Sequence, residues 1–273
     1  MNNFFKRLLT SIIIIATLLG CILYHEYTFI ILFCCIAMLT LREFYTILTT
    51  ENIKPQWITG MLAAATMLIT TGLVFTQMVN EKWLIINLPV LFLVFIYELY
   101  TKSEKPFINI AITVFGLIYI IVPFALLIAL PFLGAADANY HANLVFGYFL
   151  LIWAADTGAY LSGMFFGKHR LFERISPKKS WEGSFGGAVL NLFIAWCCSR
   201  WFPELSYISW TVMGILIIIT GTFGDLAESL LKRSLQIKDS GNLLPGHGGL
   251  LDRFDALLVS VPFVIAYLIL IKG

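Results

Sequence analysis

Charge is what this sequence has least of. Only 12% of its 273 residues are Asp, Glu, Lys or Arg, and 59% are hydrophobic. Soluble domains contain about 25% charged and about 45–50% apolar residues, because charged side chains cover a surface that faces water. A chain with so few charges cannot cover such a surface, so most of its surface must face lipid. The composition therefore excludes a soluble domain.

Other absences exclude further classes of protein. The five cysteines form no CxxC motif and no Cys/His ligand spacing, and all lie inside apolar runs, which indicates small apolar residues of membrane helices: Cys21, Cys34, Cys35, Cys197 and Cys198. The net charge of +2 is too small to indicate a nucleic-acid partner. No P-loop pattern is present, and no internal repeat is visible.

Long apolar runs fill most of the chain. A helix that crosses the hydrocarbon core of a bilayer needs about 20 mostly apolar residues. The runs predict an all-α, polytopic integral membrane protein with about nine transmembrane helices, at 8–24, 27–47, 58–79, 83–100, 107–133, 144–166, 184–202, 208–231 and 254–271. Pro123 lies inside the longest run, which is long enough to tilt or kink there.

No linker divides the chain into separate domains. Residues 1–273 are therefore expected to form a single membrane domain, with N-terminal helices in 1–133 and catalytic helices and cytoplasmic loops in 144–271.

The distribution of Lys and Arg predicts an orientation. Cytoplasmic loops of membrane proteins carry an excess of these residues. With the N-terminus inside, fifteen of the 18 Lys and Arg residues fall on the cytoplasmic side, and Lys82, Arg200 and Lys272 fall outside. Two long polar loops, 167–183 and 232–253, then lie on the cytoplasmic side. The chemistry is expected in these loops and in the helices that lead to them.

Asp156, Asp225 and Glu228 are acidic residues inside apolar runs. A charged side chain at the centre of a membrane helix costs about 2.5–3.5 kcal/mol on insertion scales. Its presence indicates a water-filled cavity or a bound cation, and a hydrogen bond or an ion pair between helices is the alternative for Asp156.

The neighbours of Asp225 and Glu228 favour a site. Ser229 is four residues after Asp225, so both side chains share one helix face. Lys232 stands in the same relation to Glu228, which predicts an ion pair at the helix end. Gly221 and Gly224 are spaced so that another backbone or a ligand can approach the helix closely.

The segment 229–255 carries the strongest signal. Gly246, Gly248 and Gly249 remove side chains around a bend, so backbone N–H groups can converge on an anion such as phosphate. A turn between two helices is the alternative for this loop. His247 within it is read equally as a general base, a phosphate donor or a turn residue.

Charged residues flank this bend. Asp252 and Asp255 are three residues apart at the start of the last helix and can face one site. Mg²⁺ commonly takes one or two carboxylates plus substrate phosphates, so this pair suits it. Four cations of the same segment can neutralise a polyphosphate: Lys232, Arg233, Lys238 and Arg253.

The other cytoplasmic loop offers a second anion-binding arm. Lys178, Lys179 and Ser180 follow Pro177, which ends the preceding element. The alternative is that these lysines only set the membrane orientation, and that Trp181 is an interfacial anchor.

Together these segments resemble the phosphatidate cytidylyltransferase family. The resemblance rests on the run from Ser229 to Asp255, which contains Ser-x-x-Lys-Arg, Lys-Asp and Pro-Gly-His-Gly-Gly-x-x-Asp-Arg-x-Asp. It extends to the segments 156–160 (Asp-Thr-Gly-Ala-Tyr), 176–183 (Ser-Pro-Lys-Lys-Ser-Trp-Glu-Gly) and 224–229 (Gly-Asp-Leu-Ala-Glu-Ser). The N-terminal half matches only as hydrophobic helices.

The resemblance implies a reaction of CTP with phosphatidate to give CDP-diacylglycerol and pyrophosphate, with Mg²⁺. It implies a dimer in the inner (cytoplasmic) membrane, with an active site that faces the cytoplasm. Asp225 and Asp252 would be the metal ligands, with Ser229 a nearby contributor. The residues implied to hold the CTP phosphates are Lys178, Lys179, Arg233 and Lys238. The composition leaves room for a second, monovalent cation without requiring one.

Two rival functions remain at this point. A cation-coupled transporter would use Asp156 and Asp225 as ion sites. Against it stand the absence of inverted repeats and the gathering of polar residues on one side. A cytidylyltransferase for an ether lipid, or an enzyme that resembles the polyprenol kinases, would keep nucleotide chemistry and change the lipid. The Asp-Gly-x-x-Ala-Arg pattern of CDP-alcohol phosphotransferases is absent from the sequence.

Overall fold

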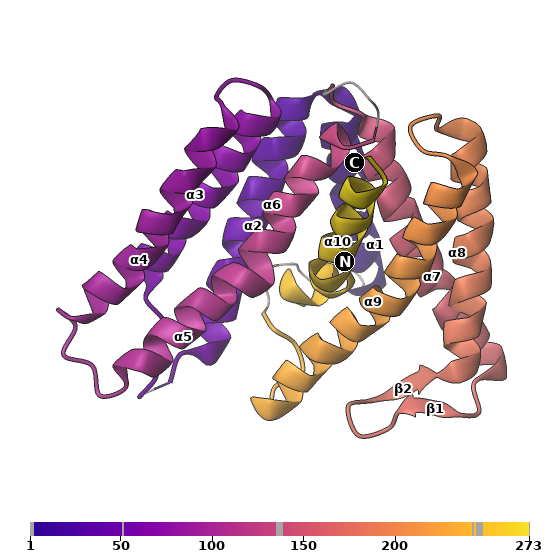
Figure 1. The fold of residues 1–273 in the computed structure, drawn as a ribbon. Coiled ribbons are helices and arrows are strands. Elements are labelled where there is room, and N and C mark those ends of the chain that lie inside the picture. The colour runs from indigo at the N-terminus through magenta and orange to yellow at the C-terminus, as the bar shows by residue number, and fades with distance from the viewer. Residues whose placement is uncertain (1–2, 51, 135–138, 242, 244–247, 273) are drawn as a thin grey trace. The chain divides into compact units, whose positions relative to one another are not determined.

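The protein is almost wholly helical (Figure 1). The structure is a computed structural model and describes residues 3–50, 52–134, 139–241, 243 and 248–272. The α-helices are α1 (Asn3–Tyr24), α2 (Glu26–Leu48), α3 (Trp57–Phe75), α4 (Asn87–Glu98), α5 (Pro106–Gly116), α6 (Val122–Ala129), α7 (Ala142–Phe166), α8 (Trp181–Trp201), α9 (Tyr207–Ser234) and α10 (Leu251–Lys272). Short 3₁₀ turns occupy Glu81–Ile86 and Leu130–Phe132, and a π-helical turn occupies Leu117–Ile121. The all-α prediction is confirmed.

A small hairpin between α7 and α8 was not predicted. Its strands, β1 (Arg170–Phe172) and β2 (Ser176–Ser180), pair antiparallel, with Arg170 opposite Ser180 (Figure 1). The strands have only three and five residues, so the sequence carries no alternating pattern from which they could be read.

Six helices of the described residues are long and apolar enough to cross a membrane. They are Glu26–Leu48, Trp57–Phe75, Pro106–Phe132, Ala142–Phe166, Tyr207–Ser234 and Leu251–Ile271. Each corresponds to one predicted run, and together they make the chain a multi-pass membrane protein.

The predicted count of nine spans is not confirmed. The apolar part of α1, Thr10–Tyr24, is short. The run 83–100 begins with a 3₁₀ turn, which leaves only 12 residues in α4. Helix α8 has 21 residues, but Asn191 and Arg200 lower its mean hydropathy. An apolar run indicates which residues can lie in the membrane. It does not indicate how many of them form one continuous α-helix.

The longest predicted span is irregular next to its proline. Helix α5 ends at Gly116, and the backbone N–H of Val122 donates to the carbonyl of Leu117, five residues earlier, before α6 continues with Pro123. Pro123 has no N–H to donate, and π-turns of this kind interrupt the regular helical ladder. The tilt or kink expected of this run stays a prediction.

The chain forms two compact units, each of which is described by itself. Unit 1 contains Met1–Ala129 and Ile237–Arg253, and unit 2 contains Leu130–Gln236 and Phe254–Gly273. This division does not coincide with the predicted division into 1–133 and 144–271. The assignment of the whole chain to a single membrane domain stays a prediction.

The core of unit 1 is built on one face of α2. Phe29, Phe33, Ala37 and Leu41 recur at intervals of one helical turn and are fully buried. The Phe33 ring packs against Phe124 of α6, with ring centroids 6.4 Å apart.

A buried carboxylate of unit 1 is paired within that unit. Glu98 at the end of α4 is 6% exposed and accepts hydrogen bonds from Gln56 Nε2 (2.6 Å) and Asn109 Nδ2 (3.1 Å). The carboxylate thus ties α4 to α5 and to the start of α3.

Glycines bring α7 and α8 of unit 2 into close contact. A Cβ atom at Gly158 would lie 2.7 Å from the carbonyl oxygen of Gly186, and one at Gly187 would lie 2.6 Å from that of Ala155. Small residues permit such approach between membrane helices. At the other side of α7, Tyr148 and Ser260 of α10 share a buried hydrogen bond of 2.6 Å between their hydroxyls.

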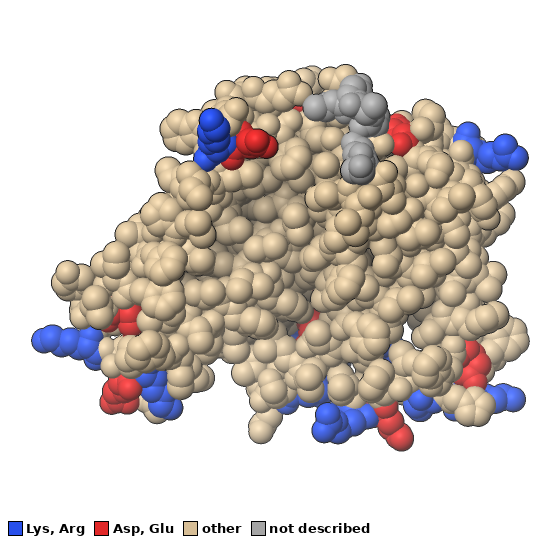
Figure 2. All heavy atoms as spheres, in the orientation of Figure 1, with Lys and Arg blue, Asp and Glu red and all other residues tan. Residues whose placement is uncertain are grey.

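The outer surface of both units is apolar between the helix ends. In unit 2 the exposed side chains include Phe165 (71%) of α7 and Phe193 (56%) of α8. On the face shown in Figure 2, most charged side chains of each unit lie toward the helix ends. Such a surface suits a lipid environment.

Candidate functional site

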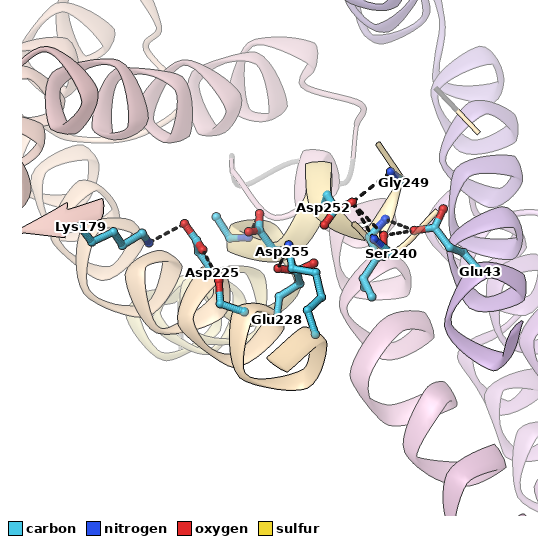
Figure 3. A network of polar contacts seen from close by, with 12 residues as sticks. Glu43, Lys179, Asp225, Glu228, Ser240, Gly249, Asp252 and Asp255 are labelled. Atoms are coloured by element: carbon cyan, nitrogen blue, oxygen red, sulfur yellow. Dashed lines mark hydrogen bonds and ion pairs between the residues drawn. The ribbon is translucent and has the colours of Figure 1, made fainter. Parts of the chain in front are cut away.

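An acidic cluster lies where α9 and α10 meet in unit 2. Carboxylate oxygens of Asp225, Glu228 and Asp255 lie within 4.8 Å of one another. Asp225 and Glu228 are one turn apart on α9, and Asp255 comes from the first turns of α10 (Figure 3). Glu228 is almost fully buried, with 1% exposed, and the other two are partly buried. Three carboxylates held so close require positive charge nearby.

Glycines of α9 make this meeting of helices feasible. A Cβ atom at Gly224 would collide with the backbone carbonyl of Asp255, and one at Gly221 would lie 3.5 Å from Ala256. The expected close approach of a backbone to Gly221 and Gly224 is therefore confirmed, and the approaching backbone is that of α10. The sequence predicted the close approach but not which segment would make it.

Two lysines neutralise part of the cluster. Lys179 Nζ of β2 lies 2.5 Å from Asp225 Oδ2, and Lys232 Nζ lies 2.7 Å from Glu228 Oε2 (Figure 3). Ser229 Oγ donates to Asp225 Oδ1 at 3.3 Å. The predicted pairs at i and i+4, Asp225 with Ser229 and Glu228 with Lys232, are thereby confirmed.

A fourth carboxylate belongs to the same neighbourhood. Asp156 of α7 interacts electrostatically with Lys179 and Asp225. Asp255 in turn interacts with Asp225, Asp156 and Lys179. Unit 2 thus brings together Asp156, Asp225, Glu228 and Asp255 from three helices, around the ammonium group of Lys179. The gathering is more acidic than basic, which is the arrangement that a divalent cation needs.

The hairpin that carries Lys178 and Lys179 is fixed at its base. Ser180 is the N-cap of α8, and its Oγ accepts the N–H of Gly183 at 3.1 Å. Glu182 in the first turn of α8 accepts the backbone N–H of Lys168 (3.1 Å) and that of His169 (3.2 Å). It also pairs with His169 Nδ1 at 2.6 Å.

These hydrogen bonds favour the ionised form of Glu182. The bond from His169, together with bonds from backbone N–H groups, lowers the pKa of Glu182 from 4.5 to about 2. A carboxylate with a lowered pKa stabilises the fold above its ordinary pKa and loses that contribution as the pH falls through the lowered value. The anchor of the hairpin is therefore complete above about pH 4.5 and is lost only near pH 2.

Replacing Glu182 should loosen the hairpin while the carboxylates of the acidic cluster stay in place. We expect Glu182→Ala to raise the KM for CTP, the substrate that the family resemblance implies, about 3- to 10-fold and to change kcat little, because the loss of a few hydrogen bonds displaces Lys178 and Lys179. Steady-state kinetics on the purified protein measure both constants.

Glu173→Ala is the matched control, since Glu173 is an exposed glutamate in the turn of the same hairpin. A KM that rises equally in both variants, or in neither, would contradict the role of Glu182 as the anchor.

Unit 1 holds a second carboxylate cluster, at the N-terminus of α10. Asp252 Oδ2 accepts three hydrogen bonds of 3.0 Å, from Ser240 N, Ser240 Oγ and Gly249 N (Figure 3). Gly248 has φ +81°, a conformation that residues with a Cβ atom rarely adopt. Ser240 and Gly249 are thus both held at the side chain of Asp252.

Glu43 of α2 completes this second cluster. Its carboxylate accepts the N–H of Leu250 (2.9 Å) and of Leu251 (3.1 Å), and Ser240 Oγ donates to it as well. The backbone amides at the start of α10 therefore bind carboxylates of the chain itself. The sequence predicted that backbone N–H groups around Gly249 bind a phosphate, and that contact stays a prediction.

The remaining predicted site residues fall into three groups. Lys178, Arg233, Lys238 and Arg253 are exposed. Gly246 and His247 lie outside the described residues. Ser180 is buried as a helix cap, and its contact with a substrate stays a prediction. The pairing of Asp225 with Asp252 as metal ligands, and a common site for Asp252 and Asp255, also stay predictions.

Glu43 and Glu182 are the residues that sequence reasoning missed. Glu43 lies inside the apolar run 27–47, so it carries the same signal that singled out Asp156. Glu182 was quoted only as part of a motif. Its position two residues after Ser180, in the first turn of a helix that Ser180 could cap, was the available signal, because acidic residues are favoured there.

Comparisons with known proteins agree with this chemistry. A sequence profile of the cytidylyltransferase family matches residues 5–271. The phosphatidate cytidylyltransferase of Staphylococcus aureus (strain COL) is 31% identical over 264 residues, which cover 94% of this chain and 96% of that protein. That of Staphylococcus epidermidis (strain ATCC 35984) has the same identity and coverage. That of Haemophilus influenzae is 43% identical over 130 residues, which cover 45% of each chain.

Proposed function

The chain belongs to the cytidylyltransferase family, and we propose that it is a phosphatidate cytidylyltransferase, which forms CDP-diacylglycerol and pyrophosphate from CTP and phosphatidate in phospholipid biosynthesis. One observation of the structure carries this proposal. Asp225, Glu228 and Asp255 converge in a membrane-spanning unit beside Lys179, and this arrangement suits a cation together with phosphate groups.

The reaction requires little proton transfer. A phosphate oxygen of phosphatidate attacks the α-phosphorus of CTP and forms a new P–O bond. The bond from the α-phosphorus to the bridging oxygen of the β-phosphate breaks, and its electron pair leaves with pyrophosphate. Both reactants are anions, so alignment and the screening of their repulsion are what the protein must supply.

The acidic cluster fits a divalent cation. Its donors are carboxylate oxygens, which are the ligands that Mg²⁺ prefers, and they already lie within 4.8 Å of one another. We propose that Asp225, Glu228 and Asp255 would hold Mg²⁺. Bound there, the ion supplies positive charge that screens the repulsion between the substrates. The resemblance also implies Asp252 as a ligand, and that assignment stays a prediction.

The lysines provide ammonium groups that can bind the phosphate oxygens of a substrate. Lys179 and Lys232 are each paired with a carboxylate of the cluster. With these carboxylates as ligands of Mg²⁺, both ammonium groups would be positioned to bind phosphate oxygens. The same role is proposed for the exposed cations Lys178, Arg233 and Lys238, as the family resemblance implies.

The setting of the reaction is part of the proposal. We place the active site on the cytoplasmic side of the inner membrane, with the N-terminus cytoplasmic, because Lys and Arg concentrate on that side. CTP would then arrive from water, and the lipid would enter from the membrane. A homodimer is proposed on the family resemblance alone.

The proposal is tested with the purified protein in detergent micelles. It is incubated with CTP labelled in the cytosine ring and with phosphatidate, with Mg²⁺ or with EDTA. We expect chloroform-soluble label only when phosphatidate and Mg²⁺ are both present. Absence of label in the lipid phase, for a protein that is folded by circular dichroism, would refute the proposal.

Parallel acceptors decide between the rival functions. Label transferred to an archaeal-type ether lipid and not to phosphatidate would favour the different lipid substrate. A transporter has no reason to transfer the label to any lipid, so its signature would be cation flux in vesicles without lipid labelling.

A further inference from the structure

Glu43 contacts the residues next to Asp252, which lies in the first turn of α10. It lies on α2, about 200 residues before these residues in sequence, and is only 9% exposed. Its carboxylate accepts hydrogen bonds from Ser240 Oγ, Leu250 N and Leu251 N. Within unit 1, one side chain of α2 therefore holds both ends of the segment that precedes α10.

The contacts are of a strong kind. The first amides of a helix have no intrahelical partner, and a carboxylate that accepts them is favoured by the helix dipole as well. Charge-assisted hydrogen bonds are about twice as strong as neutral ones. Glu43 thereby sets where the first turn of α10 begins.

The surrounding glycines are shaped to the Glu43 side chain. A Cβ atom at Gly241 would lie 2.7 Å from Glu43 Oε2, and one at Gly249 would collide with Glu43 Oε1. The glycines on both sides of the loop thus leave room for a carboxylate. This observation gives Gly249 a purpose other than exposing its backbone to a phosphate.

Ser240 links Glu43 to Asp252. Its hydroxyl contacts the carboxylate of Glu43 and lies 3.0 Å from Asp252 Oδ2, while its backbone N–H donates to the same Asp252 oxygen. A hydroxyl has one proton, so it donates fully to only one carboxylate at a time. When the Ser240 hydroxyl donates its hydrogen bond to Glu43, it does not donate to Asp252 at the same time.

We propose that Glu43 is a positioning residue for the cytidylyltransferase reaction: through Leu250, Leu251 and Ser240 it fixes the orientation of the Asp252 carboxylate. This inference rests on the proposed function, since it gives Asp252 a role in that reaction. The role proposed for Glu43 is exerted through Ser240, Leu250 and Leu251, so it is assigned as a positioning residue.

Glu98 provides a matched control. It is a glutamate of the same unit and is similarly buried, at 6% exposure. It accepts hydrogen bonds from two residues, where Glu43 accepts them from three. Its donors, Gln56 and Asn109, are outside the segment 240–251. A glutamine at either position keeps the shape, removes the charge and points an NH₂ group at former donors. The two variants therefore share a structural penalty, and only Glu43→Gln disturbs the Asp252 loop.

The test compares Glu43→Gln and Glu98→Gln with the full-length wild type. We expect Glu43→Gln to lower activity about 10- to 100-fold, the size of effect seen when partners of ligating residues are removed, and to raise the Mg²⁺ concentration that gives half-maximal rate. Glu98→Gln should keep the Mg²⁺ dependence of the wild type. Equal Mg²⁺ dependence in all three proteins would overturn the proposal.

A second readout does not depend on activity. Amide hydrogen exchange, followed without metal or substrate, should be about 10-fold or more faster at Leu250 and Leu251 in Glu43→Gln than in the wild type or Glu98→Gln. Unchanged exchange at these amides would overturn the proposal. An inactive wild type that still shows this exchange difference would refute the proposed function while supporting the contacts of Glu43.

Ser240→Ala covers the case in which Glu43→Gln does not fold. The alanine keeps the backbone N–H that Asp252 accepts and removes only the hydroxyl link. It should shift the Mg²⁺ dependence in the same direction by a smaller factor, and wild-type Mg²⁺ dependence in this variant would refute the link through Ser240.

Discussion

Asp225→Asn should reduce the transfer of cytidylate to lipid by about 10²- to 10³-fold, because it removes charge from the centre of the acidic cluster. Asp225 contacts Lys179 and Ser229 and lies beside Glu228 and Asp255, so it connects the lysine of the hairpin to the other carboxylates of the cluster. The asparagine has nearly the same shape and can still accept from Ser229. The loss of rate is therefore expected with a thermal unfolding temperature close to that of the wild type.

Glu204→Gln is the control for this variant. Glu204 is a partly buried carboxylate of the same unit that accepts a hydrogen bond from Asn143 at 2.8 Å, and it precedes the N-terminus of α9 while Asp225 lies toward its C-terminus. It should keep wild-type activity. Equal rates for Asp225→Asn and Glu204→Gln, measured with saturating CTP and Mg²⁺, would rule out Asp225 as a residue of the active site.

Asp252→Asn should abolish activity and leave the protein folded. The side-chain oxygen of the asparagine can still accept a hydrogen bond from Gly249 or Ser240, so the start of α10 keeps part of its cap. The negative charge, which the proposed metal-ligand role requires, is lost. Labelled-CTP assays and thermal unfolding of the same preparation measure the two properties.

Asp252→Ala separates charge from capping. It removes charge and acceptor together, so it should lose activity and also unfold at a lower temperature, because a lost cap costs about 1 kcal/mol. If the Asn variant has a normal rate and only the Ala variant fails, the role of Asp252 is structural and its assignment as a metal ligand is wrong.

Local spacing in the sequence predicted part of the site correctly. The pairs Asp225 with Ser229 and Glu228 with Lys232 follow from the geometry of one helix, and the structure contains both contacts. The glycines at 221 and 224 predicted a close neighbour in the same way. Such predictions succeed because residues within two turns of a helix have a fixed geometry whatever the rest of the chain does.

Contacts between distant segments could not be predicted in this way. The residues next to Glu43 in the sequence do not indicate that its side chain binds the backbone of Leu250 and Leu251. That contact depends on the packing of α2 against the start of α10. The ion pair of Lys179 with Asp225 likewise depends on a hairpin whose strands are too short to leave a pattern. Only the presence of Glu43 in an apolar run signalled that it needed a partner.

The fold class was predictable and the number of spans was not. Composition alone requires helices in lipid, because irregular backbone cannot be exposed there. The run 83–100 shows the limit, since its apolar residues divide between a 3₁₀ turn and the short α4. Mean hydropathy is the same whether these residues form one α-helix or a 3₁₀ turn followed by a short helix, so it cannot detect the division.

The central claim is that the α-phosphoryl group of CTP, with its cytidine, is transferred to phosphatidate. The most direct measurement uses two preparations of CTP, one radiolabelled at the α-phosphorus and the other at the γ-phosphorus, each incubated with the protein, phosphatidate and Mg²⁺. We predict that the α label enters the chloroform phase and that the γ label stays in water as pyrophosphate. A γ label that enters the lipid would contradict the account and indicate a kinase reaction, and so would the failure of both labels to enter it.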